Sequence, residues 1–185
     1  MGAFFGDVIL KFMDEKNEKP MKFPQFAEQI IEMVRKDQAM RLKVKDNTAQ
    51  MDSEIDRVNL EQIKKIVGQI GWPSKSKVGE NASGGAWLLV QHADNDVDFQ
   101  SECLQMTKML PEDEVNRQNI AYLEDRVRIN RGEPQLYGTQ FRINSSGEFE
   151  PQPIEDVERV NGRRQQMGLN TLEEYRMQFK EFYGK

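Results

Sequence analysis

The chain contains a single cysteine, Cys103, and a single histidine, His92, among its 185 residues. One cysteine excludes an internal disulfide, and the two residues are too few for the usual zinc sites, which take four such ligands. We therefore expect no disulfide framework and no zinc cluster, and a reducing compartment fits this composition best. No cofactor-binding motif is recognised, so no cofactor and no metal are expected.

Long apolar runs and an excess of basic charge are also missing. No run approaches the roughly 20 apolar residues of a membrane span, and the N-terminus lacks the basic start of a signal peptide. The formal net charge is -5 at pH 7, whereas proteins that bind nucleic acid usually present a basic surface. We expect a cytoplasmic protein with neither a nucleic-acid nor a membrane partner.

Helical periodicity dominates what is present. Residues 86–93 are apolar in every helical direction, which is typical of a helix enclosed by the rest of a domain. Apolar stripes at helical spacing predict further helices within residues 24–41, 53–70, 97–110, 120–131, 154–167 and 171–182. Two extended segments about a Gly147 turn predict a small β-hairpin near residues 135–154. The expected fold is mainly α, a compact bundle of about seven helices around a buried central helix.

Residues 1–20 are expected to form an amphipathic arm and a linker, followed by a single helical domain over residues 21–185. The apolar residues of the arm follow helical spacing and would serve as a helix-in-groove anchor for a protein partner. They are Phe4, Phe5, Val8, Ile9 and Phe12.

Several local features make sharper predictions. Residues 75–79 are expected to be a loop, with Asn81 or Ser83 capping the central helix. Thr171 and Glu174 have the spacing of a capping box. Asp37, Gln38 and Arg41 are expected in the polar last turns of one helix, and Arg163 and Arg164 on a solvated helix face with local ion pairs.

The central helix directs two polar side chains into the core. Gln91 and His92 fall between apolar directions, so each needs a hydrogen-bond partner there, or a ligand in its place. His92 is the only side chain of this sequence whose unperturbed pKa lies near neutrality, so it is a candidate general acid or base. A hydrogen-bonded structural histidine is the alternative, and no Ser or Cys at a recognisable elbow spacing supports a nucleophilic triad.

Arg126 lies inside the apolar arc of its helix, where a guanidinium needs a carboxylate or an anionic ligand. Its candidate protein partners are Asp94, Asp125 and Asp156.

A second candidate region combines a flexible glycine with three hydrogen-bonding side chains, and either a turn or a binding function explains it. These side chains are Tyr137, Thr139 and Gln140.

Asp94, Asp96 and Asp98 alternate as at the start of a calcium loop. The pattern fails at the next requirements, because Phe99 stands where the tight-turn glycine belongs and Gln105 where the closing glutamate belongs. Helix capping is the better interpretation.

Five motifs occur in order along the chain: Gly71-Trp72-Pro73, Gln91-His92-Ala93-Asp94, Leu123-Glu124-Asp125-Arg126-Val127, Tyr137-Gly138-Thr139-Gln140, and Arg163-Arg164 with Gly168-Leu169 and Tyr175. Together they resemble a bacterial family of domains of unknown function, with a likeness that covers approximately residues 30 to 180. The resemblance implies a compact bacterial domain and carries no established activity.

The resulting hypothesis is a site that binds a small polar or anionic ligand, such as a nucleotide or phosphorylated metabolite, in a hydrolase or transferase. His92 would move a proton, and Arg126 would hold an anion. The predicted ligand-binding residues are Gln91, Asp94, Asp125, Arg126, Tyr137, Thr139 and Gln140. The alternative is a sealed structural network inside a non-catalytic protein-protein interaction module.

Overall fold

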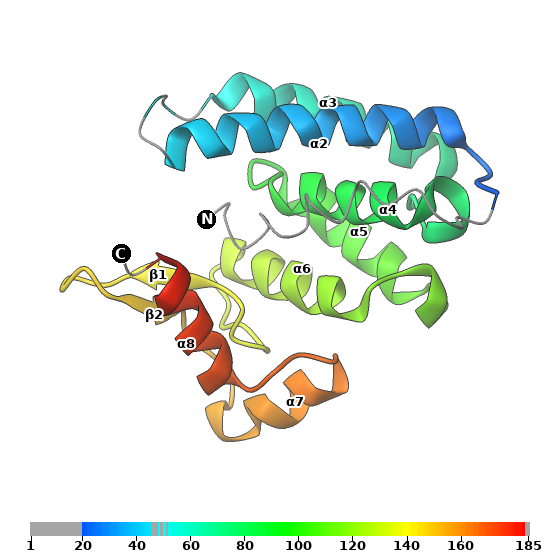
Figure 1. The fold of residues 1–185 in the computed structure, drawn as a ribbon. Coiled ribbons are helices and arrows are strands. Elements are labelled where there is room, and N and C mark those ends of the chain that lie inside the picture. The colour runs from blue at the N-terminus through cyan, green and yellow to red at the C-terminus, as the bar shows by residue number, and fades with distance from the viewer. Residues whose placement is uncertain (1–19, 46–47, 49, 51, 184–185) are drawn as a thin grey trace.

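The computed structural model describes residues 20–45, 48, 50 and 52–183. These residues form a mainly helical structure with one small antiparallel hairpin, which confirms the predicted fold class (Figure 1). The α-helices are α2 (Pro24–Lys45), α3 (Ser53–Ile70), α4 (Lys75–Gln91), α5 (Val97–Lys108), α6 (Arg117–Asn130), α7 (Val160–Gln166) and α8 (Leu172–Tyr183). The remaining elements are η1 (Glu112–Glu114), β1 (Phe141–Ile143), β2 (Phe149–Pro151) and η2 (Val157–Arg159). The predicted N-terminal arm lies outside the described residues.

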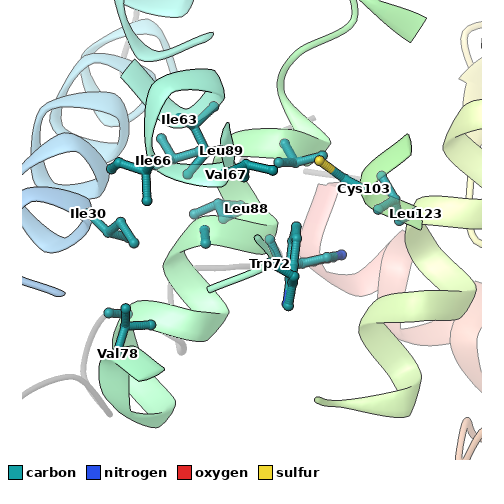
Figure 2. Close-up of a cluster of buried hydrophobic side chains, with 14 of the residues drawn as sticks. Ile30, Ile63, Ile66, Val67, Trp72, Val78, Leu88, Leu89, Cys103 and Leu123 are labelled. Atoms are coloured by element: carbon teal, nitrogen blue, oxygen red, sulfur yellow. The ribbon is translucent and has the colours of Figure 1, made fainter. Parts of the chain in front are cut away.

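Helix α4 occupies the centre of the helical part. The α2 and α3 pair packs on one side of it, and α5 and α6 pack on the other (Figure 1). Figure 2 shows Leu88 and Leu89 of α4 among the buried side chains of these neighbours, which include Ile30, Ile63, Ile66, Cys103 and Leu123. The apolar circumference of residues 86–93 is thereby covered, as the sequence pattern predicts.

Gly85 explains how α2 comes so close to α4. A Cβ atom at this position would lie 2.9 Å from Val34 Cγ2 and 3.1 Å from Ile30 Cγ2. These distances are too short for a side chain, so the glycine lets the two helices meet at a distance that an alanine would increase. This close contact also brings the C-terminal half of α2 toward the end of α4.

The start of α4 differs from the prediction. Residues 75–78 form a helical turn instead of a loop, and the helix continues past a kink at Gly79, where φ is 80° and ψ is 164°. Asn81 and Ser83 therefore lie inside the helix, and neither caps its start.

The C-terminal part packs an aromatic cluster between α8 and the hairpin. Arg142 pairs with Glu150 in the antiparallel register, and Phe141 stacks on Phe179 with ring centroids 4.3 Å apart. The predicted capping box is confirmed, because Thr171 N donates to Glu174 Oε2 at 2.9 Å and Glu174 N donates to Thr171 Oγ1 at 3.2 Å. Among the described helices none is long and apolar enough to cross a membrane.

Candidate functional site

His92 lies at the C-terminal end of α4, where its imidazole meets a carboxylate of α2. The Nδ1 atom is 3.1 Å from the carboxylate of Asp37, which is completely buried. Arg41 Nε donates to the same carboxylate at 3.1 Å, and Arg41 Nη2 donates to Asp56 Oδ1 at 2.7 Å. Gln38 Nε2 also donates to Asp37, at 2.6 Å. These contacts join the ends of α2, α3 and α4.

The polar residues expected in the last turns of α2, Asp37, Gln38 and Arg41, are largely buried. Asp37 is 0 % and Gln38 is 4 % exposed. Asp37 follows Ile30 by seven residues, so it continues the buried stripe of α2 as that helix passes over the end of α4. The seven-residue spacing from Ile30 is therefore the sequence signal for the burial of Asp37. This spacing does not reveal that a histidine lies opposite the carboxylate.

The protonation states follow from burial and these contacts. Burial raises the pKa of Asp37, but the hydrogen bonds from His92 and Arg41 and the charge of Arg41 outweigh it, so the pKa lies below its ordinary value. Burial lowers the pKa of His92, and the opposing effect of Asp37 is smaller. A neutral imidazole facing a carboxylate donates from Nδ1, which leaves a lone pair on Nε2. Within the described residues no group hydrogen-bonds to this Nε2 atom.

A second carboxylate lies beside this pair. Arg126 Nε donates to Asp94 Oδ1 at 2.7 Å, Arg126 Nη2 donates to Asp94 Oδ2, and Asn130 Nδ2 donates to Oδ1 at 2.9 Å. Of the three carboxylates considered for Arg126, Asp94 is therefore its ion-pair partner. Burial raises the pKa of Asp94, but the hydrogen bond and charge of Arg126 hold it below its ordinary value.

Electrostatic effects connect the two groups of residues. The charge of Arg126 contributes to lowering the pKa of His92, and the charge of Asp94 contributes to raising the pKa of Asp56 after the larger effect of burial. We call these residues the His92 cluster, which consists of Asp37, Arg41, Asp56, His92, Asp94 and Arg126.

Arg126 also starts a chain of hydrogen bonds that leads away from the cluster. Its Nη1 donates to Gln140 Oε1 at 3.1 Å, and Gln140 Nε2 donates to Thr139 Oγ1 at 3.0 Å. Thr139 Oγ1 in turn donates to Asp125 Oδ2 at 2.9 Å. Of the predicted ligand-binding residues, Gln140 therefore contacts the cluster directly, whereas Thr139 and Asp125 belong to a more distant part of the network.

Asp125 anchors the turn that precedes β1. Its completely buried carboxylate accepts the backbone N–H groups of Leu136 at 2.7 Å, Tyr137 at 3.0 Å and Thr139 at 2.9 Å. Burial raises the pKa of Asp125, and these amides partly oppose that effect. A carboxylate that satisfies so many amides holds the backbone in place, which assigns Asp125 a structural contact in this turn.

The other two predicted ligand-binding residues make separate contacts. Gln91 is buried and its Nε2 donates to the carbonyl of Tyr122 at 3.4 Å, whereas its Oε1 has no hydrogen-bond partner among the described residues. Tyr137 is half-buried, and burial followed by the charges of Glu124 and Asp125 raises its pKa. Within the described part of the chain neither side chain forms a hydrogen bond to His92.

Residues 24–185 match the model of DUF6624, described as a family of unknown function. The chain belongs to this family. No curated protein and no solved structure matches the chain. The predicted resemblance to a family of domains of unknown function is thus confirmed at the level of the family.

In this DUF6624 chain the prediction that Arg163 and Arg164 lie on a solvated helix face is wrong for Arg164, which is 0 % exposed. Arg164 Nε donates to the carbonyl of Asn170 at 2.6 Å, and Nη1 donates to the carbonyl of Tyr137 at 2.6 Å. The guanidinium also lies over the Tyr175 ring, 5.0 Å from its centroid. The short α7 has too few apolar residues to show which of its faces is buried, so its sequence held no usable signal for this contact.

The three alternating aspartates have separate partners. Asp96 Oδ1 accepts the N–H of Phe99 at 3.0 Å and caps α5, as predicted. Asp98 is 3.5 Å from Arg131, whereas Asp94 belongs to the His92 cluster. Within the described residues no group of three or more His, Cys, Asp or Glu is placed to hold a metal ion.

Proposed function

We propose that the His92 cluster binds a small polar ligand and that His92 accepts a proton from it, as a general base does in hydrolases and transferases. The contact between His92 Nδ1 and the buried Asp37 carboxylate, at 3.1 Å, carries this proposal. It orients the imidazole and stabilises the positive charge that the ring acquires on accepting a proton at Nε2.

The surrounding residues support this assignment of roles. Asp37 is a positioning residue, and Arg41 holds it through Nε at 3.1 Å. Among the described residues no Ser or Cys hydrogen-bonds to His92, which favours a water molecule or a ligand hydroxyl as the group that loses the proton. Asp94 and Arg126 supply further polar atoms for orienting a ligand beside the imidazole.

A structural network in a non-catalytic module is the second candidate. It is favoured by Arg126, whose Nε, Nη1 and Nη2 all donate to protein oxygens of Asp94 and Gln140. A guanidinium satisfied in this way has less need of a ligand. The two candidates differ in the role of His92 Nε2, which only the first one uses.

The substitutions His92→Asn and His92→Gln separate the two candidates. The amide of asparagine replaces the donor at Nδ1 and has no atom in place of Nε2, so we expect His92→Asn to keep the contact with Asp37. Turnover would be measured on panels of ester, phosphoester, glycoside and amide substrates, and ligand binding by thermal shift. We expect His92→Asn to lose about 10²- to 10⁴-fold in turnover, the usual contribution of a general base.

His92→Gln is the matched variant, because its longer amide tends to place a polar group near Nε2. It is expected to lose turnover equally while weakening the contact with Asp37 and lowering thermal stability further. Wild-type turnover in His92→Asn would disprove the general-base role. A chain that turns over no substrate and responds to no ligand, with variants that change only stability, would favour the structural network.

A further inference from the structure

The most exposed charged group of the His92 cluster is a carboxylate, that of Asp94. The side chain of Asp94 is 43 % exposed, whereas those of Arg126 and Arg41 are 14 % and 12 % exposed. Both arginines donate to carboxylates of the cluster, at 2.7 Å to Asp94 and 2.7 Å to Asp56. A ligand that approaches from solvent therefore meets Asp94 before it meets a positive charge.

His92 adds a second hydrogen-bond acceptor. Its side chain is 8 % exposed, and its Nδ1 contacts Asp37 at 3.1 Å. The Nε2 atom of the neutral ring is an acceptor that has no protein donor among the described residues. In the proposed function the ligand supplies the donor for this acceptor.

The net charge of the His92 cluster also favours a cationic ligand over an anionic one. Its three carboxylates, from Asp37, Asp56 and Asp94, outnumber the guanidinium groups of Arg41 and Arg126. The neutral imidazole adds no charge, so the cluster carries a net negative charge. A phosphate or carboxylate at this place would face Asp94 and would have to displace it from Arg126.

Asp94 is also held in a defined position despite its exposure. Besides Arg126, the Nδ2 of Asn130 donates to its Oδ1 at 2.9 Å, and the Nε2 of the buried Gln100 is 3.4 Å from the same atom. Gln100 itself donates to the carbonyl of Val90 at 3.0 Å, at the end of α4. An acceptor that is fixed before the ligand arrives loses little conformational entropy on binding.

We infer that the ligand is a hydroxylated amine, such as an amino sugar or amino alcohol, and not the anionic metabolite suggested by Arg126 alone. Its ammonium group binds Asp94, and a hydroxyl group donates to Nε2 of His92. This inference rests on the proposed function, because it assumes that Nε2 faces the ligand. It adds the class of ligand and the residue that selects it.

The single histidine provides a direct test, because the imidazole signals in an NMR spectrum of the full chain come from His92 alone. Three probes share one hexose ring and differ in charge: glucosamine, glucose and glucuronate. We expect glucosamine to shift the His92 signals at the lowest concentration, glucose to need roughly tenfold more, as for a lost charge-assisted hydrogen bond, and glucuronate to have no effect.

Three variants assign the preference to Asp94. In Asp94→Asn the advantage of glucosamine over glucose is expected to disappear, and in Asp94→Glu it is expected to remain at least in part. Asp98→Asn is the matched control, because its carboxylate is 94 % exposed and lies outside the cluster, and it is expected to leave the preference unchanged. Melting curves of each variant establish that the fold is retained.

A larger shift with glucuronate than with glucosamine would overturn the inference and leave the proposed function standing. No shift of His92 with any of the three probes would also overturn the inference. The turnover of His92→Asn decides the proposed function independently, because that comparison does not depend on the charge of the ligand.

Discussion

His92 and Asp37 lie 55 positions apart in the sequence, and the imidazole Nδ1 approaches the buried carboxylate to 3.1 Å. One residue follows the last turn of α4 and the other lies on the buried face of α2. Because a neutral base and an ionised acid share a site that is almost closed to water, the contact affects stability as well as chemistry.

Replacing Asp37 with asparagine is expected to destabilise the chain strongly. The amide cannot carry the negative charge that accepts hydrogen bonds from Gln38 and Arg41, so the buried guanidinium of Arg41 loses one of its carboxylate partners and keeps Asp56. Breaking a buried ion pair on one side costs about 3–5 kcal/mol in the free energy of unfolding. Urea unfolding followed by circular dichroism measures this loss.

The matched control is Glu32→Gln on the exposed face of the same helix. Glu32 accepts from Arg35 at 2.7 Å, and both side chains are exposed. Exposed pairs contribute at most about 1 kcal/mol. Equal losses in Asp37→Asn and Glu32→Gln would contradict the assignment of Asp37 as a buried partner.

Stability is expected to depend on pH through His92. Burial lowers the pKa of His92 below its ordinary value of 6.5, so the unfolded chain binds this proton at a higher pH than the folded chain does. The free energy of unfolding should therefore fall as the pH decreases from 6.5 toward the folded pKa, and His92 should add no slope above this window. Unfolding measured between about pH 5 and pH 8 tests this.

His92→Asn is the control for this window, because it has no group that titrates there. Its slope is expected to be smaller than that of the wild type. Asp37 acts at lower pH, because its pKa lies below the ordinary value of 3.8 and the stability it contributes is lost as the pH falls through the folded pKa. Identical slopes near pH 6 in both proteins would refute a lowered pKa of His92.

Asp125→Asn is expected to release the turn that its carboxylate holds. The substitution removes one acceptor oxygen and places an NH₂ group against backbone donors, and each unsatisfied donor costs about 1–3 kcal/mol. Hydrogen exchange of the amides of Leu136, Tyr137 and Thr139, which donate to Asp125, measures the effect directly. In Asp125→Asn these three amides should exchange faster than in the wild type, whereas the amides of α4 should keep their wild-type rates. Unchanged protection of the three amides would exclude the anchoring role.

Gly138→Ala tests how tightly the same turn is packed. At this residue φ is +71°, and an added Cβ would lie 2.8 Å from Leu172 Cδ1 and 2.9 Å from Ile154 Cδ1. Gly132 has a similar φ of +76° with no atom within 4 Å of the added Cβ, so Gly132→Ala pays only the backbone cost of about 1 kcal/mol. Thermal unfolding should show a loss about 1–3 kcal/mol larger for Gly138→Ala. Equal losses would show that the neighbours move aside freely.

Local patterns were sufficient for most of the fold. The apolar stripes predicted the helices, and the spacing of Thr171 and Glu174 predicted the capping box, because both depend on residues a few positions apart. The turn around Gly79 was missed, since a short helical segment that joins a longer one through a kink has no periodicity of its own. For the site, the wheel position of Arg126 correctly indicated a need for a carboxylate, although it left three candidates.

The sequence by itself determined the helical class, the enclosed position of residues 86–93 and the polar groups that had to find partners in the core. These follow from the period of the helix and from the cost of burying an unpaired polar atom. Only the tertiary structure decided that Asp37 faces His92 and that Asp94 pairs with Arg126. Such pairs form where α2 and α6 pack beside the end of α4, and packing over long sequence separations depends on the whole set of buried surfaces rather than on the residues near either partner.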